Sequence, residues 1–316
     1  MPHSDPVNLP GITPVFCSPE ALLPALAEEG KAPFRLHMGL ARVDEADWIA
    51  CDQAGLLPLR WALLEQRHEA VFAALADTHT MGQEVQAMLA THLVRHCPQR
   101  FMLQEEGRYL LDSAAGMRHD LEHPGRHPLE RAACLVAEDL CLLASDAPGT
   151  SHRLVAACVC FPSRWLLADK VGKELAAIHG PVPFYPEHLA SAMDRLFANL
   201  RPGMILQRSN WTIHDSATLF QPTAQPLQAI TAQEAPGHFF VRSERQTLRR
   251  LPQTGAVLFT ILTRLCPLAD FLAKPTCAAA LLQALDNLPE ETARYRGLAP
   301  YREQLQALLQ TARASA

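Results

Sequence analysis

The sequence has no excess of basic residues and no long apolar run. Its 28 lysines and arginines are outnumbered by 33 aspartates and glutamates, giving a net charge of −5, whereas a nucleic-acid-binding surface requires a basic footprint. No apolar stretch approaches the roughly 20 residues of a membrane helix, and the N-terminus has neither the basic start nor the apolar core of a signal peptide. We therefore expect a cytoplasmic protein with neither nucleic acid nor membrane as a partner.

Short signatures of catalysis and cofactor attachment are also missing. The chain contains no GxGxxG, P-loop, GxSxG or HExxH motif, so it carries no obvious nucleotide site of its own. Its nine cysteines include no CxxC framework and no CxxCH motif, which excludes covalent attachment of a c-type haem by that motif. Most lie inside apolar runs, so we interpret them as buried free thiols in a reducing compartment. Cys158 and Cys160 share one face of an expected strand and could bind a metal, but no second pair completes such a site.

The apolar content, 48% of the residues, is enough for one large domain or two ordinary ones. Periodicity and start signals predict helices from Ser18 onward and at residues 56–75, 83–96, 129–143, 187–200, 278–285 and 302–312. A hairpin is predicted at residues 101–111, strands at 154–161, 204–213, 238–244 and 256–263, and a long loop at 221–236. This order predicts an α+β domain built around an antiparallel or mixed sheet.

Several histidines stand four residues apart. His92 and His96 have a spacing that can chelate metal on a helix, but neither carries the glutamate of a zincin motif, and an exposed helix face is the favoured interpretation. His119, His123 and His127 repeat the spacing where prolines and a glycine break any helix, which indicates a surface loop.

Two acidic residues, Glu138 and Asp139, interrupt the apolar run CLVAEDLCLL, which we expect to be helical. A carboxylate in such a place must find a partner or change its pKa. We favour an ion pair or a cap to a neighbouring loop over a catalytic role.

The most informative stretch is ADKVGKELAAIHGPVP, at residues 168–183. It places Lys170 and Lys173 shortly before His179, which is followed at once by a glycine and two prolines. These residues cannot continue a helix, so His179 is expected where a helix or turn stops and the backbone becomes stiff. A histidine held in this way beside basic groups suits ligation of a cofactor that carries negative groups.

Two expected strands carry polar side chains in alternation. In QRSNW, Arg208 and Asn210 face one side and Trp211 the other, which indicates either a ligand site or an ordinary buried network. In VRSERQTLRRLP, Arg242, Glu244 and Gln246 share one face. If this face is buried, it indicates a polar ligand or an ion-pair lattice; a solvated edge strand is the alternative.

Together these segments resemble the haem-dependent oxidative N-demethylase family. The matching stretches, in the family's order, are FRLHMGL (34–40) with Asp47-Trp48, AEDLCLL (137–143), CFPSRW (160–165), DKVGKELAAIHGPVP (169–183), QRSNW (207–211) and RSERQTLRRLPQTGAVLFTI (242–261). The resemblance implies a PAS-like antiparallel sheet with helices before and after it. It divides the chain into an N-terminal extension (1–33), a haem-binding domain (34–265) and a helical segment packed on that domain (266–316).

The resemblance also implies a cofactor, a reaction and partners. The cofactor would be non-covalent haem b, and the activity oxidative removal of a methyl group from a small secondary amine such as dimethylamine, using O₂ and releasing formaldehyde. Electrons would come from NADPH through a separate reductase that carries flavin and an iron–sulfur cluster. A haem-based gas or redox sensor without turnover, and a binding protein without haem, are the alternatives.

Site roles follow from the resemblance residue by residue. His179 would ligate the iron through a neutral imidazole nitrogen. Lys170, Lys173 and Arg208 would contact the haem propionates, with Asn210 and Arg242 also on the cofactor side. Glu244 would bind the alkylammonium substrate and accept its proton, and Tyr185 would line the pocket.

Overall fold

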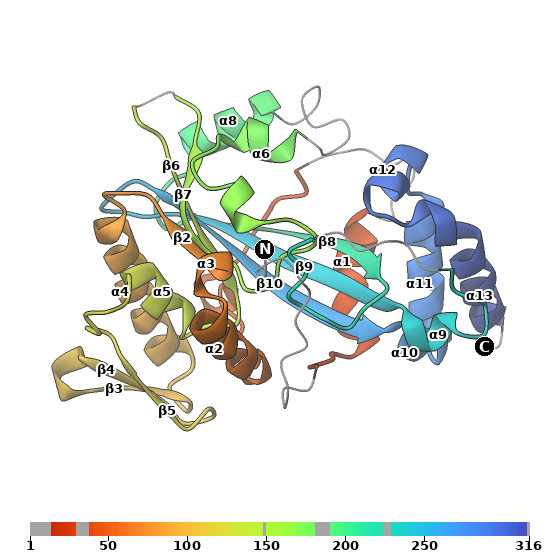
Figure 1. Cartoon of the computed structure of the whole chain (residues 1–316), viewed down its shortest axis with the longest axis horizontal. Coiled ribbons are helices and arrows are strands. Elements are labelled where there is room, and N and C mark those ends of the chain that lie inside the picture. The colour runs from red at the N-terminus through yellow and green to blue at the C-terminus, as the bar shows by residue number, and fades with distance from the viewer. Residues whose placement is uncertain (1–13, 30–37, 148–149, 181–189, 224–228, 315–316) are drawn as a thin grey trace.

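The computed structural model describes residues 14–29, 38–147, 150–180, 190–223 and 229–314. Two antiparallel sheets and several helical layers make up this part of the chain (Figure 1). The α+β class predicted from the sequence is therefore confirmed. The PAS-like identity of the sheet stays a prediction.

The large sheet has seven strands, and each strand is antiparallel to its neighbours. Across the sheet the order is β1 (Ala41–Arg42), β8 (Ile205–His214), β9 (Phe240–Arg250), β10 (Val257–Pro267), β6 (Asp139–Ala144), β7 (Arg153–Cys158) and β2 (Phe72–Ala74). A smaller sheet consists of β3 (Phe101–Gln104), β4 (Tyr109–Asp112) and β5 (Met117–Asp120). Strands β8, β9 and β10 are the longest, and they form the centre of the molecule.

Helices cover both faces of the large sheet because successive side chains of a strand point to opposite faces. Leu142 and Leu258 belong to the core under α2 (Leu57–Gln66), α4 (His79–His96) and α5 (Pro128–Ala133). Their chain neighbours Leu143 and Val257 pack in a separate core with α6 (Leu175–His179) and α8 (Ala190–Asn199). The layer of α2, α4 and α5 and the layer of α6 and α8 therefore lie on opposite sides of the sheet (Figure 1).

A third core lies at the far ends of the long strands. There Trp211 of β8, Val241 of β9 and Cys266 of β10 pack against apolar helical residues. The helices that contribute are α1 (Leu23–Glu29), α9 (Ala235–His238), α10 (Leu268–Leu272), α11 (Pro275–Asp286), α12 (Glu290–Tyr295) and α13 (Arg302–Ala314). The first and last helices of the described chain thus pack in the same core, at the ends of the three long strands.

Short segments complete the described part. The 3₁₀ turns are η1 (Pro19–Leu22), η2 (Glu45–Asp47), η3 (Ala54–Leu56), η4 (Glu105–Gly107), η5 (Leu167–Asp169) and η6 (Ala299–Tyr301). The remaining short helix, α3 (His68–Val71), leads directly into β2. Among the described residues, no helix combines the length and the apolar character needed to span a bilayer.

Most predicted elements are confirmed, with two corrections. The helix predicted at 129–143 is wrong beyond α5, because that helix stops at Ala133 and the apolar residues after Asp139 form β6. An apolar run buried on both faces has no period that separates a strand from a helix. The helix predicted at 56–75 ends early, and Phe72–Ala74 pairs with β7 instead.

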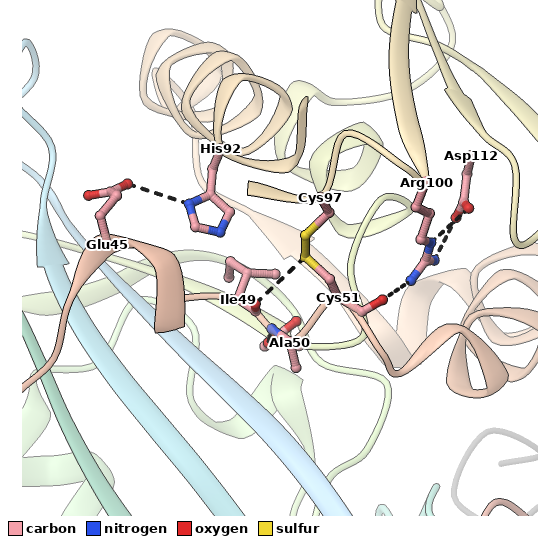
Figure 2. The surroundings of a disulfide bond; sticks show 9 residues. Glu45, Ile49, Ala50, Cys51, His92, Cys97, Arg100 and Asp112 are labelled. Atoms are coloured by element: carbon pink, nitrogen blue, oxygen red, sulfur yellow. Dashed lines mark hydrogen bonds and ion pairs between the residues drawn. A yellow bond between two sulfur atoms is a disulfide. The ribbon is translucent and has the colours of Figure 1, made fainter. Parts of the chain in front are cut away.

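Two of the nine cysteines are not free thiols. Cys51 and Cys97 form a disulfide with their Cα atoms 6.4 Å apart, joining the chain before α2 to the residue that follows α4 (Figure 2). Nearby, the Arg100 guanidinium donates to the Cys51 carbonyl at 2.5 Å and pairs with Asp112. The free-thiol prediction holds for the other seven cysteines and is wrong for this pair. The spacing of 46 residues carries no local signal for it.

Candidate functional site

His179 is the last residue of α6, so the helix stops where the sequence predicts. The segment before this helix is fixed on β7 by three backbone hydrogen bonds, which join Gly172, Lys173 and Leu175 to His152 and Leu154. Gly172 has a φ of +82°, a conformation that a side chain would strain. Leu175 and Ile178 of α6 then pack against the sheet core. The histidine therefore sits on a short helix whose start is anchored to a buried strand.

The hydrogen bond of the His179 ring determines its tautomer. Nδ1 lies 2.8 Å from the Leu175 carbonyl oxygen, and because a carbonyl only accepts, Nδ1 carries the proton. Burial lowers the pKa of His179; the Leu175 carbonyl opposes this shift, while the positive charges of Arg208 and Lys170 add to it. The imidazole is therefore neutral at neutral pH, with its lone pair on Nε2.

Two cations lie close enough to His179 to act on its ring: the charges of Arg208 and Lys170 both lower its pKa. Lys170 is directly adjacent: its Nζ donates to the Ile178 carbonyl at 3.0 Å, at the end of α6. Burial, followed by the charge of Lys173, lowers the pKa of Lys170. Lys173 itself is exposed. The predicted group of His179, Lys170 and Arg208 is thus brought together by the fold.

A row of polar side chains extends from Arg208 across β8 and β9. In the strand register Arg208 lies opposite Gln246, and Asn210 lies opposite Glu244, so the four share one face of the sheet. This is the face on which α6 packs, because Leu248, two residues beyond Gln246, belongs to the same core as Leu175. The row therefore begins beside His179.

Glu244 is the centre of this row. Its Oε1 accepts a hydrogen bond from Arg242 Nη2 at 3.0 Å, and its Oε2 accepts from Gln246 Nε2 at 3.1 Å and Asn210 Nδ2 at 3.5 Å. The side chain is 17% exposed although its strand is the third of seven. The alternative of a solvated edge strand is therefore wrong. The row is a polar patch on the interior strands β8 and β9, and part of it is accessible to solvent.

Arg242 is a buried residue that holds the Glu244 carboxylate by a hydrogen bond. It is 1% exposed, and its Nη2 also donates to the Phe161 carbonyl at 2.6 Å and to Thr263 Oγ1 at 3.2 Å. Its Nε and Nη1 have no hydrogen-bond partner among the described residues. Buried cationic donors of this kind are suited to an anionic or acceptor group.

Residues 39–306 match the family described as haem-dependent oxidative N-demethylase, alpha subunit-like. The chain belongs to this family. The match starts inside the first resembling segment and extends beyond residue 265, into the C-terminal helices. Those helices, which carry no distinctive motif, therefore lie largely within the part of the chain that matches the family. The family's name implies dependence on haem and a system with more than one kind of subunit.

The residues of this chain fit a haem in their donor chemistry. A haem-ligating histidine must be neutral and usually donates its other ring nitrogen to a carbonyl or carboxylate, as His179 does with Leu175. The propionates of a haem require cations close to the ligand, and Arg208 and Lys170 supply them.

One expected contributor cannot be placed, and one unexpected residue lies near the site. Tyr185 falls in a segment outside the described residues. Conversely, no sequence signal places Tyr295 of α12 near the site, yet the charge of Glu244 reaches this exposed side chain: desolvation and then Glu244 raise its pKa against the opposing charge of Arg296. No pattern in the C-terminal sequence identifies Tyr295, because its proximity to Glu244 depends on how α12 docks on the sheet.

The buried carboxylates of AEDLCLL serve the structure. Asp139 pairs with Arg60 at 2.9 Å, and both side chains are fully buried. Glu138 accepts a hydrogen bond from the Ala50 backbone N–H at 2.9 Å, and burial raises its pKa. The favoured interpretation of an ion pair or loop cap is therefore confirmed for both residues.

Ser163 and His214 are close enough to suggest a catalytic Ser–His pair, but the histidine has the wrong tautomer to act as the base. Ser163 Oγ lies 3.1 Å from His214 Nε2, and Gln221 Nε2 lies 3.1 Å from His214 Nδ1. Gln221 Nε2 also donates to the Thr218 carbonyl at 2.6 Å, which fixes it as the amide nitrogen. His214 Nδ1 therefore accepts, Nε2 carries the proton, and the imidazole cannot take a proton from Ser163.

Proposed function

We propose that this chain is the haem-binding oxygenase component of an N-demethylating system that acts on a small secondary amine such as dimethylamine. The observation that carries the proposal is His179: a neutral imidazole, fixed by a backbone carbonyl, beside Arg208 and Lys170 in a chain of this family. A haem sensor without turnover would use the same ligand, but it has no need of the Glu244 row.

His179 Nε2 is the proposed iron ligand, and Arg208, Lys170 and Lys173 are the proposed propionate partners. Bound haem b supplies the redox chemistry that oxidises the N-methyl carbon with O₂. The chain supplies the ligand, its tautomer and the surrounding charge. NADPH, flavin and an iron–sulfur cluster are assigned to a separate reductase protein.

Glu244 is the proposed residue for the amine. Secondary alkylamines are mostly protonated at neutral pH, whereas a neutral amine is easier to oxidise at the methyl carbon. The carboxylate can bind the ammonium ion and take its proton at Oε2, while Arg242 holds Oε1 in place. Asn210 and Gln246 orient the same carboxylate.

The reaction has a defined balance. Dimethylamine, O₂, two electrons and two protons give methylamine, formaldehyde and water, through a carbinolamine that loses formaldehyde. The direct test is to supply electrons from a surrogate reductase and to measure amine-dependent formaldehyde. Formaldehyde that rises with dimethylamine supports an oxygenase; a spectral response to O₂ or amine without formaldehyde identifies a sensor and contradicts the proposal.

We expect Glu244→Gln to keep haem content and fold but to lose turnover by about 10²-fold or more, because the variant keeps the shape and removes the charge. The measurement is formaldehyde release together with the amine-induced change in the haem spectrum. Glu20→Gln, which removes an exposed carboxylate paired with Lys274, is the matched control and should behave as wild type. Normal amine binding and turnover in Glu244→Gln would leave only a structural role for this glutamate.

We expect Arg208→Ala and Lys170→Ala each to release haem faster than wild type. A charge-assisted hydrogen bond to a propionate contributes about 1.5–3 kcal/mol when shielded from water, so each variant should lose roughly ten- to a hundred-fold in haem affinity. Transfer of haem to an excess of a scavenger protein measures this rate. Lys274→Ala, which removes an exposed cation, should show no change. Release as slow as that of wild type from both variants would contradict the propionate role.

A further inference from the structure

The end of α4 carries a second cluster of ligating groups, separate from the haem residues. His92 and His96 lie one turn apart, and Glu45 of η2 faces them from another segment. One ligand atom from each of the three residues lies within 4.8 Å of the others. Glu45 Oε1 is 3.5 Å from His92 Nδ1, as Figure 2 shows, and the two imidazole rings are 4.7 Å apart.

His92 is in an unusual state for a buried histidine. Its side chain is 1% exposed, which makes the exposed-face interpretation of this pair wrong for His92. Among the described residues, His92 Nε2 and His96 Nε2 make no hydrogen bond, and His92 Nδ1 has only its 3.5 Å contact with Glu45. Buried polar atoms are normally paired, so two unpaired imidazole nitrogens beside a carboxylate indicate a ligand site.

The charges around the cluster favour a cation as the ligand. Burial, and then the charge of His96, lowers the pKa of His92 to about 4, so at neutral pH the imidazole is neutral and one ring nitrogen keeps a lone pair for a ligand. Burial raises the pKa of Glu45, but the hydrogen bonds and charges of Arg249 and His92 together lower it, so the carboxylate is ionised. His96 lies in the last turn of α4, which is the negative end of the helix dipole, and His92 lies one turn before it.

We propose that Glu45, His92 and His96 bind a divalent transition-metal ion, with zinc as the best match. Two imidazoles and one carboxylate form a three-ligand set that leaves a fourth position for water, as in open zinc sites. Glu45 and His96 are partly exposed, so an ion can enter from solvent. Arg249 Nη1 lies 2.6 Å from Glu45 Oε1, and this competing cation weakens the binding of a metal ion.

The site lies on the face of the sheet opposite the haem residues. Arg249 is an odd-numbered residue of β9, whereas Glu244 and Gln246 are even-numbered and face α6. The bound ion would join η2 to the end of α4, and the Cys51–Cys97 disulfide joins the same two segments a few residues further along (Figure 2). The proposal is therefore independent of the proposed function, and zinc acts as a second clamp between these segments.

The test uses the full-length, haem-loaded protein without an affinity tag, dialysed against a chelator. Zinc is titrated in competition with a chromophoric chelator, and cobalt is added separately to read ligand-field absorption. We expect one zinc per chain, visible cobalt bands and a rise in the melting temperature. Glu45→Gln and His96→Gln should each weaken zinc binding at least tenfold, whereas His123→Gln, at an exposed histidine, should leave it unchanged.

Two results would overturn the site. Wild-type protein that takes up no zinc at a concentration of about 100 micromolar excludes it. Zinc binding that is equally tight in wild type, Glu45→Gln and His96→Gln assigns the ion to other groups, such as the free cysteines. Because both variants alter partly exposed side chains, their folding can be checked by circular dichroism and by unchanged haem content.

Discussion

Replacing His179 with alanine should remove essentially all haem from the purified protein or shift its Soret band to that of a different ligand. The imidazole of His179 has the tautomer, the neutrality and the rigid placement that an iron ligand needs. Burial lowers its pKa, so the neutral form persists below pH 6.5 and ligation should survive mild acid. Absorption spectra and haem-to-protein ratios measure both effects.

The control for this variant is His123→Ala, which changes an exposed histidine in a loop and should leave the spectrum unchanged. Free imidazole added to His179→Ala should restore part of the wild-type spectrum, because it can occupy the space of the lost side chain. A variant that keeps wild-type haem content and spectrum without added imidazole would remove His179 from the site.

The largest stability effect should come from Asp139→Ala, at about 3–5 kcal/mol of unfolding free energy. Asp139 Oδ1 accepts from Arg60 Nη2 at 2.9 Å and from the Cys160 N–H at 2.8 Å, and Oδ2 accepts from the Phe161 N–H at 3.1 Å. Removing the carboxylate leaves a fully buried guanidinium and two buried N–H groups without their acceptor. Urea unfolding followed by circular dichroism gives the value.

Asp146→Ala is the matched control, because Asp146 pairs with Arg153 on the surface. Exposed ion pairs contribute about 0–1 kcal/mol, so this variant should unfold close to the wild-type urea concentration. The double variant Arg60→Met, Asp139→Leu should recover part of the loss, since no charge remains buried. Equal unfolding free energies for Asp139→Ala and Asp146→Ala would show that the buried pair has no special role.

The sequence predicts the long strands well because their alternation is strong. In β9 the polar residues Arg242, Glu244 and Gln246 share one face, and the register places them as the alternation predicts. The prediction from the sequence is wrong at residues 134–143, because a strand buried on both faces shows no alternation of apolar and polar residues. A local pattern also cannot show that Arg60 is the partner of Asp139, since the two are 79 positions apart.

The candidate site also contains residues that the sequence points to and residues that only the fold brings in. His179, Lys170 and Arg208 could be proposed from the sequence because segments that resemble the family contain them, and the fold places both cations near the histidine. Tyr295 and the burial of His92 could not, because each depends on how a helix docks on the sheet. The Cys51–Cys97 disulfide was missed for the same reason.

The order of the large sheet has a further consequence for association between copies of the chain. A sheet usually exposes backbone N–H and C=O groups at its two edges, where another strand can add and start aggregation. Here the outermost strands are β1, of two residues, and β2, of three. Strand β8 extends beyond β1, and α1 packs against it. The apolar central strands are thus shielded, and the short edges offer little template for intermolecular strand pairing.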